Sequence, residues 1–347
     1  MTCITSSTVI YSWILSSFCV LSGKYFIFEA DSMTSYLVTG GAGFIGSHIV
    51  QKLLQNNSHV RVLDNFSSGK RENLSELQGK LEVLDGDLRN PADVHQAVQS
   101  IDVIFHEAAF VSNPQSILEP ELCYDINVRG TENLLEEARK AGVKRIVLAS
   151  SAAVYGDSQA IQLSEETKLK PLSPYAASKL INEIYAGMYT RSFGIEVVAL
   201  RYFNVFGPRQ APDSQYAAAI PIFIRRLLSN QAITIFGDGG QTRDLIYVQD
   251  VVHANLLAAE HPDAAGQVIN ICTGVETSVQ LLVDTLREIF PRSIDPQFAP
   301  LRAGDIYRSL GNPMRAKEIL GFQPQTTLKQ GLVNTIEWMR ACLQNPD

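Results

Sequence analysis

The chain has 347 residues, of which 46% are hydrophobic and 19% are charged, a composition typical of a globular enzyme with one large or two closely joined domains. The formal net charge of −7 argues against general nucleic-acid binding, because the chain has no excess of cations to neutralise a run of phosphates. Its five cysteines are scattered and show no CxxC spacing. That argues against a disulfide framework or a metal site and favours reduced thiols in a cytoplasmic protein.

The N-terminal residues differ in composition from the rest of the chain. Residues 1–23 carry no charged side chain, and residues 9–21 are mostly apolar. This run is too short for a membrane-spanning helix, and Lys24 follows it rather than preceding it as in a secretory signal. We expect residues 1–32 to be an extension outside the fold, with a weak membrane or targeting segment as the alternative, and no stable membrane insertion.

From Met33 to about Gly194, short apolar runs alternate with stretches of helical spacing. Strands are predicted at residues 36–38, 60–63, 103–105, 146–148 and 197–200. Helices are predicted at residues 45–54, 130–141 and 175–189, the last introduced by a Pro-Leu-Ser-Pro cap at 171–174. This alternation indicates an α/β fold with a Rossmann-type, doubly wound parallel sheet.

After Asn204 the alternation fades, and prolines and glycines divide the chain into shorter pieces. Helices are predicted at residues 218–228, 251–260, 279–290, 313–320 and 328–342. We therefore expect residues 33–204 to form the sheet domain. Residues 205–347 are expected to form mainly a smaller mixed α/β lobe over the carboxyl ends of the strands, where doubly wound folds bind ligands.

A glycine-rich loop lies between the first predicted strand and the first predicted helix. Gly40, Gly43 and Gly46, with Phe44 and Ile45 between them, open that helix. A Cβ here would block both the tight turn and the approach of backbone N–H groups to phosphate, and the helix N-terminus adds its positive dipole end. We interpret the loop as a dinucleotide pyrophosphate site rather than a plain structural turn.

The next two strand ends supply the rest of the nucleotide site. Asp64 ends the second apolar run, where a carboxylate would accept hydrogen bonds from ribose hydroxyls and repel a 2′-phosphate. This favours NAD over NADP as the cofactor, the alternative being a strand-end turn before Asn65. Asp87 and Leu88 follow the next apolar run and are expected beside the adenine.

Small residues follow the strand predicted at 103–105. Ala108 and Ala109 stand where the backbone has to pass close to the cofactor. His106, just before them, is expected to be a satisfied structural histidine rather than a catalytic group. All the cofactor contacts expected so far fall within residues 33–204.

Tyr175 and Lys179 are four residues apart and share one helix face. A phenol with a pKa near 10 is a poor base at neutral pH. A neighbouring ammonium and the positive charge of oxidised nicotinamide would stabilise the phenolate and lower that pKa. Ser151, at the end of the intervening strand, would hydrogen-bond the reacting oxygen and share its proton with Tyr175, while Ser150 is expected to contact backbone or cofactor.

These motifs resemble the UDP-hexose 4-epimerases of the extended short-chain dehydrogenase/reductase family, and in particular the branch acting on UDP-N-acetylglucosamine. The G-x-x-G-x-x-G spacing of the loop is typical of that family. The resemblance covers nearly everything from Met33 onward and has no counterpart for the N-terminal extension. Further segments that carry it are Asp64-Asn65-Phe66-Ser67, Asn127-Val128-Arg129-Gly130-Thr131, Leu200-Arg201-Tyr202-Phe203-Asn204-Val205-Phe206-Gly207, Gly237-Asp238-Gly239-Gly240-Gln241-Thr242-Arg243-Asp244 and Arg302-Ala303-Gly304-Asp305.

The resemblance implies that NAD stays bound through a cycle with no net redox change. Tyr175 would take the proton of the sugar 4-hydroxyl while hydride leaves C4 for the nicotinamide. The 4-keto sugar would then turn about its bond to the diphosphate and accept hydride on its other face. Lys179 and Tyr175 would also contact the cofactor, together with Asn65, Asn127 and Tyr202.

The resemblance also implies the diphosphate and uridine contacts. Asn204 would contact the sugar-diphosphate, Arg243 and Arg302 the diphosphate, and Asp305 the uridine ribose. The forked donors of arginine suit phosphate, although a surface salt bridge is the alternative for Arg243.

Substrate choice rests on the pocket beside the sugar C2 substituent. The family's pocket position is filled here by Ser309, which leaves room for an N-acetyl group, whereas a tyrosine would restrict the pocket to glucose and galactose. An exposed loop serine without a role is the alternative. Ala218 and Ala219 are likewise small residues where a tight pocket would need bulk, and Ser151 completes the expected substrate contacts.

Related activities are weighed against the same positions. Ala152 and Ala153 cannot move a proton, yet sugar-nucleotide 4,6-dehydratases need an acid/base pair there and UDP-glucuronate decarboxylases a glutamate. We expect an NAD-dependent 4-epimerase of UDP-N-acetylglucosamine and UDP-N-acetylgalactosamine, with UDP-glucose and UDP-galactose as further substrates. The alternatives are a UDP-glucuronate or UDP-N-acetylglucosaminuronate 4-epimerase and a catalytically silent NAD-binding scaffold. The resemblance further implies a homodimer formed through residues 111–141 and 175–189.

Overall fold

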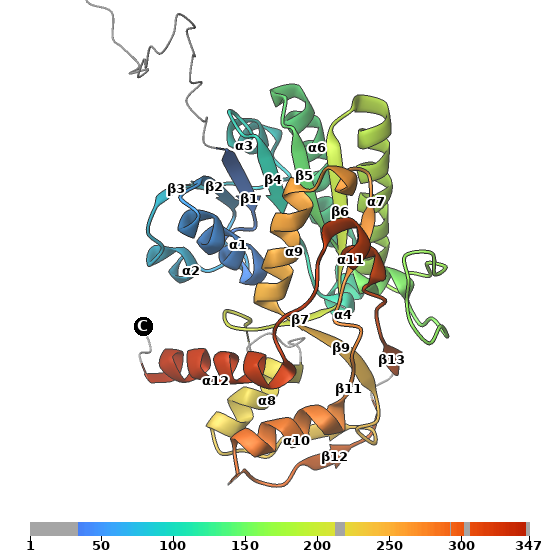
Figure 1. The fold of residues 1–347 in the computed structure, drawn as a ribbon. Helices are drawn as coiled ribbons and strands as arrows, with labels where there is room; N and C mark the ends of the chain where they lie inside the picture. Colours follow the sequence, from blue (N-terminus) through green and yellow to red (C-terminus); the bar gives the residue numbers. More distant parts are fainter. Residues whose placement is uncertain (1–33, 212–218, 292, 302–305, 345–347) are drawn as a thin grey trace, which may run out of the picture.

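The computed structural model describes residues 34–211, 219–291, 293–301 and 306–344 (Figure 1). The N-terminal extension and three predicted substrate residues, Ala218, Arg302 and Asp305, lie outside the described residues. Within those residues, no helix combines the length and apolar character needed to cross a membrane.

The main sheet has seven strands, all paired in parallel, in the order β10-β6-β5-β4-β1-β2-β3. The chain order reverses between β1 and β4, so the carboxyl ends of these two strands border the crevice where doubly wound sheets bind ligands. The strands are β1 (Ser35–Thr39), β2 (His59–Asp64), β3 (Lys80–Asp85), β4 (Val103–His106), β5 (Arg145–Ser151), β6 (Glu196–Tyr202) and β10 (Val268–Ile271).

Helices cover both faces of this sheet (Figure 1). One face carries α1 (Phe44–Gln55), α9 (Val248–Glu260) and α11 (Met314–Leu320), and the other carries α3 (Pro91–Ala97), α6 (Gly130–Ala141) and α7 (Pro174–Phe193). The connections hold α2 (Glu72–Ser75), α4 (Asn113–Leu118), α5 (Pro120–Tyr124), a π-helical segment (Asp125–Arg129) and two 3₁₀ turns (Ala152–Tyr155 and Pro262–Ala264).

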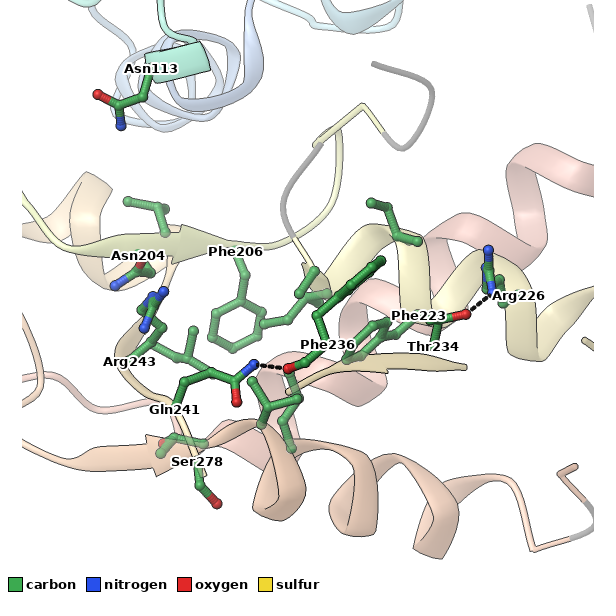
Figure 2. A pocket seen from close by; sticks show the side chains of 18 of the residues that line it. Asn113, Asn204, Phe206, Phe223, Arg226, Thr234, Phe236, Gln241, Arg243 and Ser278 are labelled. Atoms are coloured by element: carbon green, nitrogen blue, oxygen red, sulfur yellow. Dashed lines mark hydrogen bonds between the residues drawn. The ribbon is translucent and has the colours of Figure 1, made fainter. Parts of the chain in front are cut away.

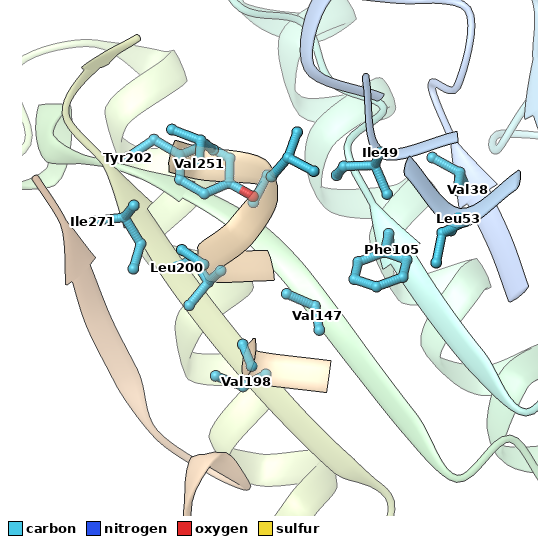
Figure 3. Close-up of a cluster of buried hydrophobic side chains, with 14 of the residues drawn as sticks. Val38, Ile49, Leu53, Phe105, Val147, Val198, Leu200, Tyr202, Val251 and Ile271 are labelled. Carbon is cyan, nitrogen blue, oxygen red and sulfur yellow. The ribbon is translucent and has the colours of Figure 1, made fainter. Parts of the chain in front are cut away.

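Each central strand contributes to both apolar layers because its side chains alternate between the two faces. In β5, Val147 belongs to the cluster under α1 and α9, whereas Ile146 and Leu148 belong to the cluster under α6 and α7. All three are fully buried. Figure 3 shows the first cluster, in which Val147 and Phe105 of the sheet lie between Leu53 of α1 and the strand β6.

A smaller lobe lies beyond the carboxyl ends of the strands (Figure 1). Its four-stranded sheet joins β7 (Asn204–Phe206), β9 (Thr242–Tyr247), β11 (Glu276–Ser278) and β13 (Arg308–Ser309), and β8 (Thr234–Phe236) pairs with β12 (Gln297–Ala299). The helices α8 (Ala219–Leu228), α10 (Val279–Ile289) and α12 (Leu328–Gln344) enclose a separate apolar cluster in this lobe.

The predicted Rossmann-type fold is confirmed. The helix expected at residues 130–141 coincides with α6, and α7 begins at Pro174 because the Ser173 hydroxyl accepts the Ala176 N–H at 3.1 Å. The strand β10 was not expected: it comes from the range assigned to the smaller lobe, yet it pairs with β6 in the main sheet. The predicted division at Asn204 therefore does not separate two independent sheets.

Candidate active site

The glycine loop makes the tight connection that a dinucleotide requires. Gly40 has φ of 67°, and a Cβ there would lie 2.6 Å from the backbone nitrogen of Ala108. At Gly46 a Cβ would collide with the carbonyl oxygen of Gly40. Gly43 is the N-cap of α1 and supplies no side-chain cap, so the end of the helix at Phe44 is left to a ligand.

Asp64 ends β2 beside this loop. Its Oδ2 accepts the Ala42 N–H at 2.9 Å and its Oδ1 accepts the Phe66 N–H at 2.8 Å, while burial raises the pKa of the carboxyl. The strand-end turn considered as an alternative is thus present. It does not displace the ribose role, because each carboxylate oxygen can accept a second hydrogen bond.

The residues expected beside the adenine lie in two different environments, one polar and one apolar. Asn65 donates to Asp87 Oδ2 at 2.8 Å, and Asp87 also bonds Arg89, whose guanidinium holds the pKa of that carboxyl well below its usual range. These polar groups form a rim at the ends of β2 and β3. Leu88 is instead buried in the apolar cluster against α6, where its carbonyl accepts a hydrogen bond from Asn133.

The side chain of His106 holds the end of β4 in place through two hydrogen bonds. His106 bonds Thr39 Oγ1 through Nδ1 at 2.7 Å and Thr131 Oγ1 through Nε2 at 2.9 Å. Burial lowers the pKa of its imidazole to about 3, so the ring is neutral. Both ring nitrogens are therefore engaged, in agreement with the structural role expected for this histidine.

The side chain of Asn127 also holds the segment that follows β4. Its Oδ1 accepts the Phe110 N–H at 2.7 Å, and its Nδ2 donates to the Phe110 carbonyl at 3.0 Å and to Ser178 Oγ at 2.9 Å. The side chain thus holds the backbone just beyond Ala108 and Ala109. Direct contact of Asn127 with a cofactor stays a prediction.

The expected catalytic group is brought together at the crevice. Ser151 ends β5 and hydrogen-bonds Tyr175, and its Oγ also accepts the Ala153 N–H at 3.1 Å. The Lys179 ammonium lies 6.0 Å from the centre of the Tyr175 ring and donates to the Ala149 carbonyl at 2.8 Å. The end of β5, the 3₁₀ turn directly after it and the more distant helix α7 therefore meet around one phenol.

The electrostatics of this group differ from the expectation. Burial raises the pKa of Tyr175 above its usual value, and the Ser151 hydrogen bond opposes this only in part. Burial also lowers the pKa of the Lys179 ammonium to about 8. The lowering of the Tyr175 pKa is thus not found in the chain by itself, and an added positive charge is needed to obtain it.

The hydroxyl of Ser150, which was expected to contact backbone or cofactor, donates to Glu183 Oε1 of α7 at 2.5 Å. A cofactor contact of Ser150 stays a prediction. Glu183 also forms a two-pronged ion pair with Arg201 at 2.8 and 2.7 Å, and both side chains are 4% exposed. Arg201 in turn donates to the Tyr155 hydroxyl, so a buried polar network joins α7 to β5 and β6.

A cavity of about 680 Å³ opens beside the crevice, between the start of α4 and the smaller lobe. Figure 2 shows Asn204 and Arg243 at one end of it, Arg226 and Thr234 at the other, and Phe236 between them. Ala219 also lines the cavity. Among the predicted substrate residues within the described ranges, the structure therefore brings together Asn204, Arg243 and Ala219.

Ser309 is not among the residues that line the cavity, but it stands next to one that does. It is the register partner of Arg243 in the parallel pair β13–β9, and register partners point to the same face of a sheet. Asp244, the next residue of β9, accepts hydrogen bonds from the backbone of Thr273, Gly274 and Gly311. This buried carboxylate fixes the strands that carry Arg243 and Ser309.

Comparison with known proteins agrees with this geometry. Residues 36–272 match the model of the NAD dependent epimerase/dehydratase family. The chain belongs to that family. It is an NAD-dependent epimerase, and the resemblance drawn from its motifs is confirmed.

Three relatives illustrate the match. A UDP-glucose 4-epimerase of Mycolicibacterium smegmatis is 41% identical, with 88% of this chain and 98% of the relative covered. The structure of a UDP-N-acetylglucosamine 4-epimerase from Methanobrevibacter ruminantium, in complex with UDP-N-acetylmuramic acid, is 37% identical with a TM-score of 0.86 and covers 89% of this chain and 99% of that one. The UDP-glucose 4-epimerase of Thermotoga maritima, solved with UDP-glucose, is 38% identical with a TM-score of 0.85, covering 89% and 100%.

The residues present fit the cofactor of this family. The close approach of Gly40 to Ala108 leaves no room for a side chain at the turn, and the uncapped start of α1 and the Asp64 carboxylate lie at neighbouring strand ends. These groups would hold the pyrophosphate and the ribose of NAD. When bound, NAD accepts a hydride from an alcohol carbon and returns it.

Several residues that line the cavity were missed from the sequence, among them Phe236 and Asn113. Phe236 lines the cavity at the end of β8, directly before the glycine turn at 237–240, and its place next to that turn was the available signal. Asn113 faces the cavity from the start of α4, where it accepts a hydrogen bond from the Ser173 hydroxyl at 2.6 Å. No pattern in the sequence connects residues 113 and 173.

Proposed function

We propose that the protein is a UDP-sugar 4-epimerase whose preferred substrates are UDP-N-acetylglucosamine and UDP-N-acetylgalactosamine. The observation that carries this proposal is that Ser309 pairs in register with Arg243, a residue that lines the cavity, so that both side chains belong to the same face of one sheet. A cation suited to the diphosphate and a small residue suited to a bulky sugar substituent are thereby neighbours. The relatives with UDP-sugar names support the reaction class.

The catalytic proposal assigns proton transfer to Tyr175. As phenolate it takes the proton of the sugar 4-hydroxyl while C4 is oxidised to a ketone, and it returns that proton when C4 is reduced on the opposite face. Ser151, which hydrogen-bonds Tyr175, holds the reacting oxygen and bridges it to the phenol. Lys179 supplies a positive charge from the next turn of α7 that stabilises the phenolate.

The substrate proposal places the nucleotide in the cavity. Arg243 and Asn204 at one end contact the diphosphate, and Phe236 supplies an aromatic face for the uracil. Ala219 leaves the wall of α8 open to the ligand. Contacts from Ala218, Arg302 and Asp305 remain part of the proposal on the strength of the sequence motif.

Proton NMR of the purified protein with UDP-N-acetylglucosamine, UDP-glucose and UDP-glucuronate in separate tubes, without added NAD, tests the substrate. We expect the galacto anomer to appear fastest in the first tube. Conversion of UDP-glucose alone contradicts the role of Ser309, and conversion of UDP-glucuronate alone favours the uronic acid alternative. No conversion in any tube favours the silent scaffold.

A variant sharpens the test. Ser309→Tyr is expected to abolish turnover of the N-acetylated substrate and to keep turnover of UDP-glucose, because the ring fills the space beside C2. Ser309→Ala is the matched control, since it keeps the space and removes only the hydroxyl. Equal losses on both substrates in Ser309→Tyr would show that the residue does not select the C2 substituent.

We also propose that the protein is a homodimer. Helices α4, α5 and α7 present apolar side chains to solvent, among them Ile117, Leu118, Leu122 and Ile184, which are 37% to 71% exposed. Single exposed apolar residues are common, but a group on adjacent helices is typical of an interface. Pairing this face with its copy would bury it in a helical bundle that includes α7, the helix that carries Tyr175.

A further inference from the structure

A hydrogen-bonded chain that the proposed mechanism does not use lies at the end of β4. The Tyr202 hydroxyl lies 2.7 Å from Glu107 Oε1 and 3.0 Å from Asn255 Oδ1. The orientation of the Asn255 amide is set by its Nδ2, which donates to the Val251 carbonyl at 2.9 Å. Tyr202 and Asn255 are buried, and Figure 3 shows Tyr202 packed alongside Val251.

The number of protons in this chain can be counted. A tyrosine hydroxyl has one proton, and here it faces two oxygen atoms that act as acceptors. With Glu107 ionised, one of the two contacts would bring lone pairs together without a proton between them. With Glu107 protonated, the carboxyl donates to Tyr202 and Tyr202 donates to Asn255, so every contact is a hydrogen bond.

Glu107 is also in the right place to affect the cofactor crevice. It follows β4, and its N–H donates to the Thr39 carbonyl at the end of β1, so it lies where the strand order reverses. Its side chain is partly exposed, whereas its partners Tyr202 and Asn255 are buried. Enclosure by protein raises the pKa of the Glu107 carboxyl to about 7.

The charged and titratable groups that face Glu107 are few. From α7 come Lys179 and Tyr175, from β6 comes Tyr202, and the neighbouring His106 is neutral and bonded to two threonines. A negative charge on Glu107 raises the pKa of both Lys179 and Tyr175. An ionised Glu107 would therefore attract the ammonium and oppose formation of the phenolate.

We propose that Glu107 is a positioning residue that carries a proton in the working enzyme and so leaves the charge of Lys179 to Tyr175. The proposal rests on the proposed function, since it concerns the activation of Tyr175. It assigns to Tyr202 and Asn255 the task of keeping that proton in place. Glu107 itself donates no proton to the substrate.

Infrared difference spectra between the wild-type holoenzyme and Glu107→Gln, recorded from pH 5.5 to 9, test the proton directly. We expect the band of a protonated carboxyl at pH 6, lost as the pH rises past neutral. Absence of that band at pH 6 overturns the proposal. This readout does not depend on turnover, so it decides the question even if the proposed epimerase activity fails.

Two variants test the hydrogen-bonded chain, because they are expected to shift the pH at which Glu107 titrates in opposite directions. Asn255→Leu frees the Tyr202 proton for the carboxylate, so the Glu107 titration is expected to move to lower pH by about one unit. Tyr202→Phe removes the hydroxyl that can donate to the carboxylate and is expected to move the Glu107 titration to higher pH. Thermal melting identifies a variant that has lost its fold, and shifts in the same direction in two folded variants overturn the proposed chain.

The pH dependence of kcat connects the proton to catalysis. In Glu107→Gln no negative charge can form, so the rising limb that reports deprotonation of Tyr175 is expected to reach lower pH than in wild type, whose Glu107 loses its proton as the pH rises past neutral and then opposes the phenolate. Glu82, which pairs with Arg61 on β2 away from the crevice, gives the control variant Glu82→Gln. A rising limb at the same pH in Glu107→Gln and in wild type overturns the link between Glu107 and Tyr175.

Discussion

The phenol of Tyr175 illustrates how much a catalytic residue depends on what surrounds it. Burial alone makes this phenol a weaker acid than a free tyrosine, so less phenolate forms at neutral pH, and the Ser151 hydrogen bond and nearby positive charge oppose that effect. The same burial excludes water and strengthens every charge interaction around the phenol. Enclosure thus disfavours the phenolate in the free protein and favours it once a cation is bound beside the phenol.

Tyr175→Phe is expected to lower kcat by about 10²- to 10⁴-fold, because it removes the acid–base group and little else. NAD content, measured by absorbance after denaturation, is expected to stay near that of wild type. Tyr185→Phe, on the same helix and outside the crevice, is the control and is expected to keep its rate. An unchanged kcat in Tyr175→Phe would remove the tyrosine from the mechanism.

Lys179 gives a prediction about stability. Its pKa falls from 10.5 to about 8 on burial, so folding disfavours its charged form. The penalty is fully present below pH 8, is relieved as the pH rises from about 8 to 10.5, and is absent above that range. The shift corresponds to about 3 kcal/mol.

We therefore expect Lys179→Met to be inactive and yet more stable than wild type at pH 7, by about 1–3 kcal/mol in the free energy of unfolding. Urea unfolding of the cofactor-free protein at pH 7 and pH 10 measures this difference, which should shrink at the higher pH. Lys52→Met, at an exposed position of α1, is the control and should stay within about 0.5 kcal/mol of wild type. A destabilised Lys179→Met would mean that the bond to Ala149 outweighs the burial penalty.

Among single residues, the sequence predicted those whose pairing follows from their spacing along the chain. Tyr175 and Lys179 lie one helical turn apart, so their pairing follows from the helix alone. Asn113 and Glu107 reach the site through contacts across the fold, which spacing along the chain does not reveal, whereas Phe236 could have been found from its place before the glycine turn. The bond of Ser150 to Glu183 was missed for the same reason, since tertiary packing brings that residue of α7 to the strand.

The helix α7 needs to be held in register with β5 for Tyr175 to meet Ser151. The buried pair Glu183–Arg201, with the Ser150 hydroxyl as a third partner, joins the two elements one turn beyond Lys179. Removing one charge of a buried pair leaves the other without compensation, which typically destabilises by 3–5 kcal/mol. Replacing both with apolar residues of similar volume is often close to neutral.

Arg201→Met is expected to lower the free energy of unfolding by about 3–5 kcal/mol, and the double variant Arg201→Met/Glu183→Leu is expected to recover most of that loss. Chemical denaturation of wild type, Arg201→Met, Glu183→Leu and the double variant gives the four free energies of unfolding. The kcat of the double variant reports whether the polar pair also sets the register of α7. Full additivity of the two single changes would contradict a coupled pair. Arg139→Met/Glu136→Leu, an exposed pair, is the control.

The elements themselves were largely predictable because their signals are periodic. Apolar runs flanked by turns marked the central strands, and the Pro-Leu-Ser-Pro segment marked the start of α7. The short strand β10 has only four residues and follows a region without alternation, so nothing local distinguishes it from the strands of the smaller lobe. Its partner, β6, decides where it belongs.

The whole molecule is proposed to work as a dimer, and the exposed apolar face permits a direct test. Ile184→Arg is expected to yield monomers in sedimentation velocity, because a charge buried in an apolar interface has no partner there. Ile161→Arg, which changes another exposed isoleucine outside α4, α5 and α7, should leave the assembly intact. A wild-type protein that sediments as a monomer would contradict the proposed dimer.

The pairing of β10 with β6 also bears on how the protein is made. The ribosome releases the first six strands of the main sheet well before residues 268–271, and α9 and α11, which cover one face, arrive late as well. Until then the nascent chain has an open edge on β6 and an uncovered apolar face, both of which invite aggregation. Arrested nascent chains ending near residue 260 should therefore be protease-sensitive and bound by chaperones, and the sheet should become protected only after about three quarters of the polypeptide has emerged.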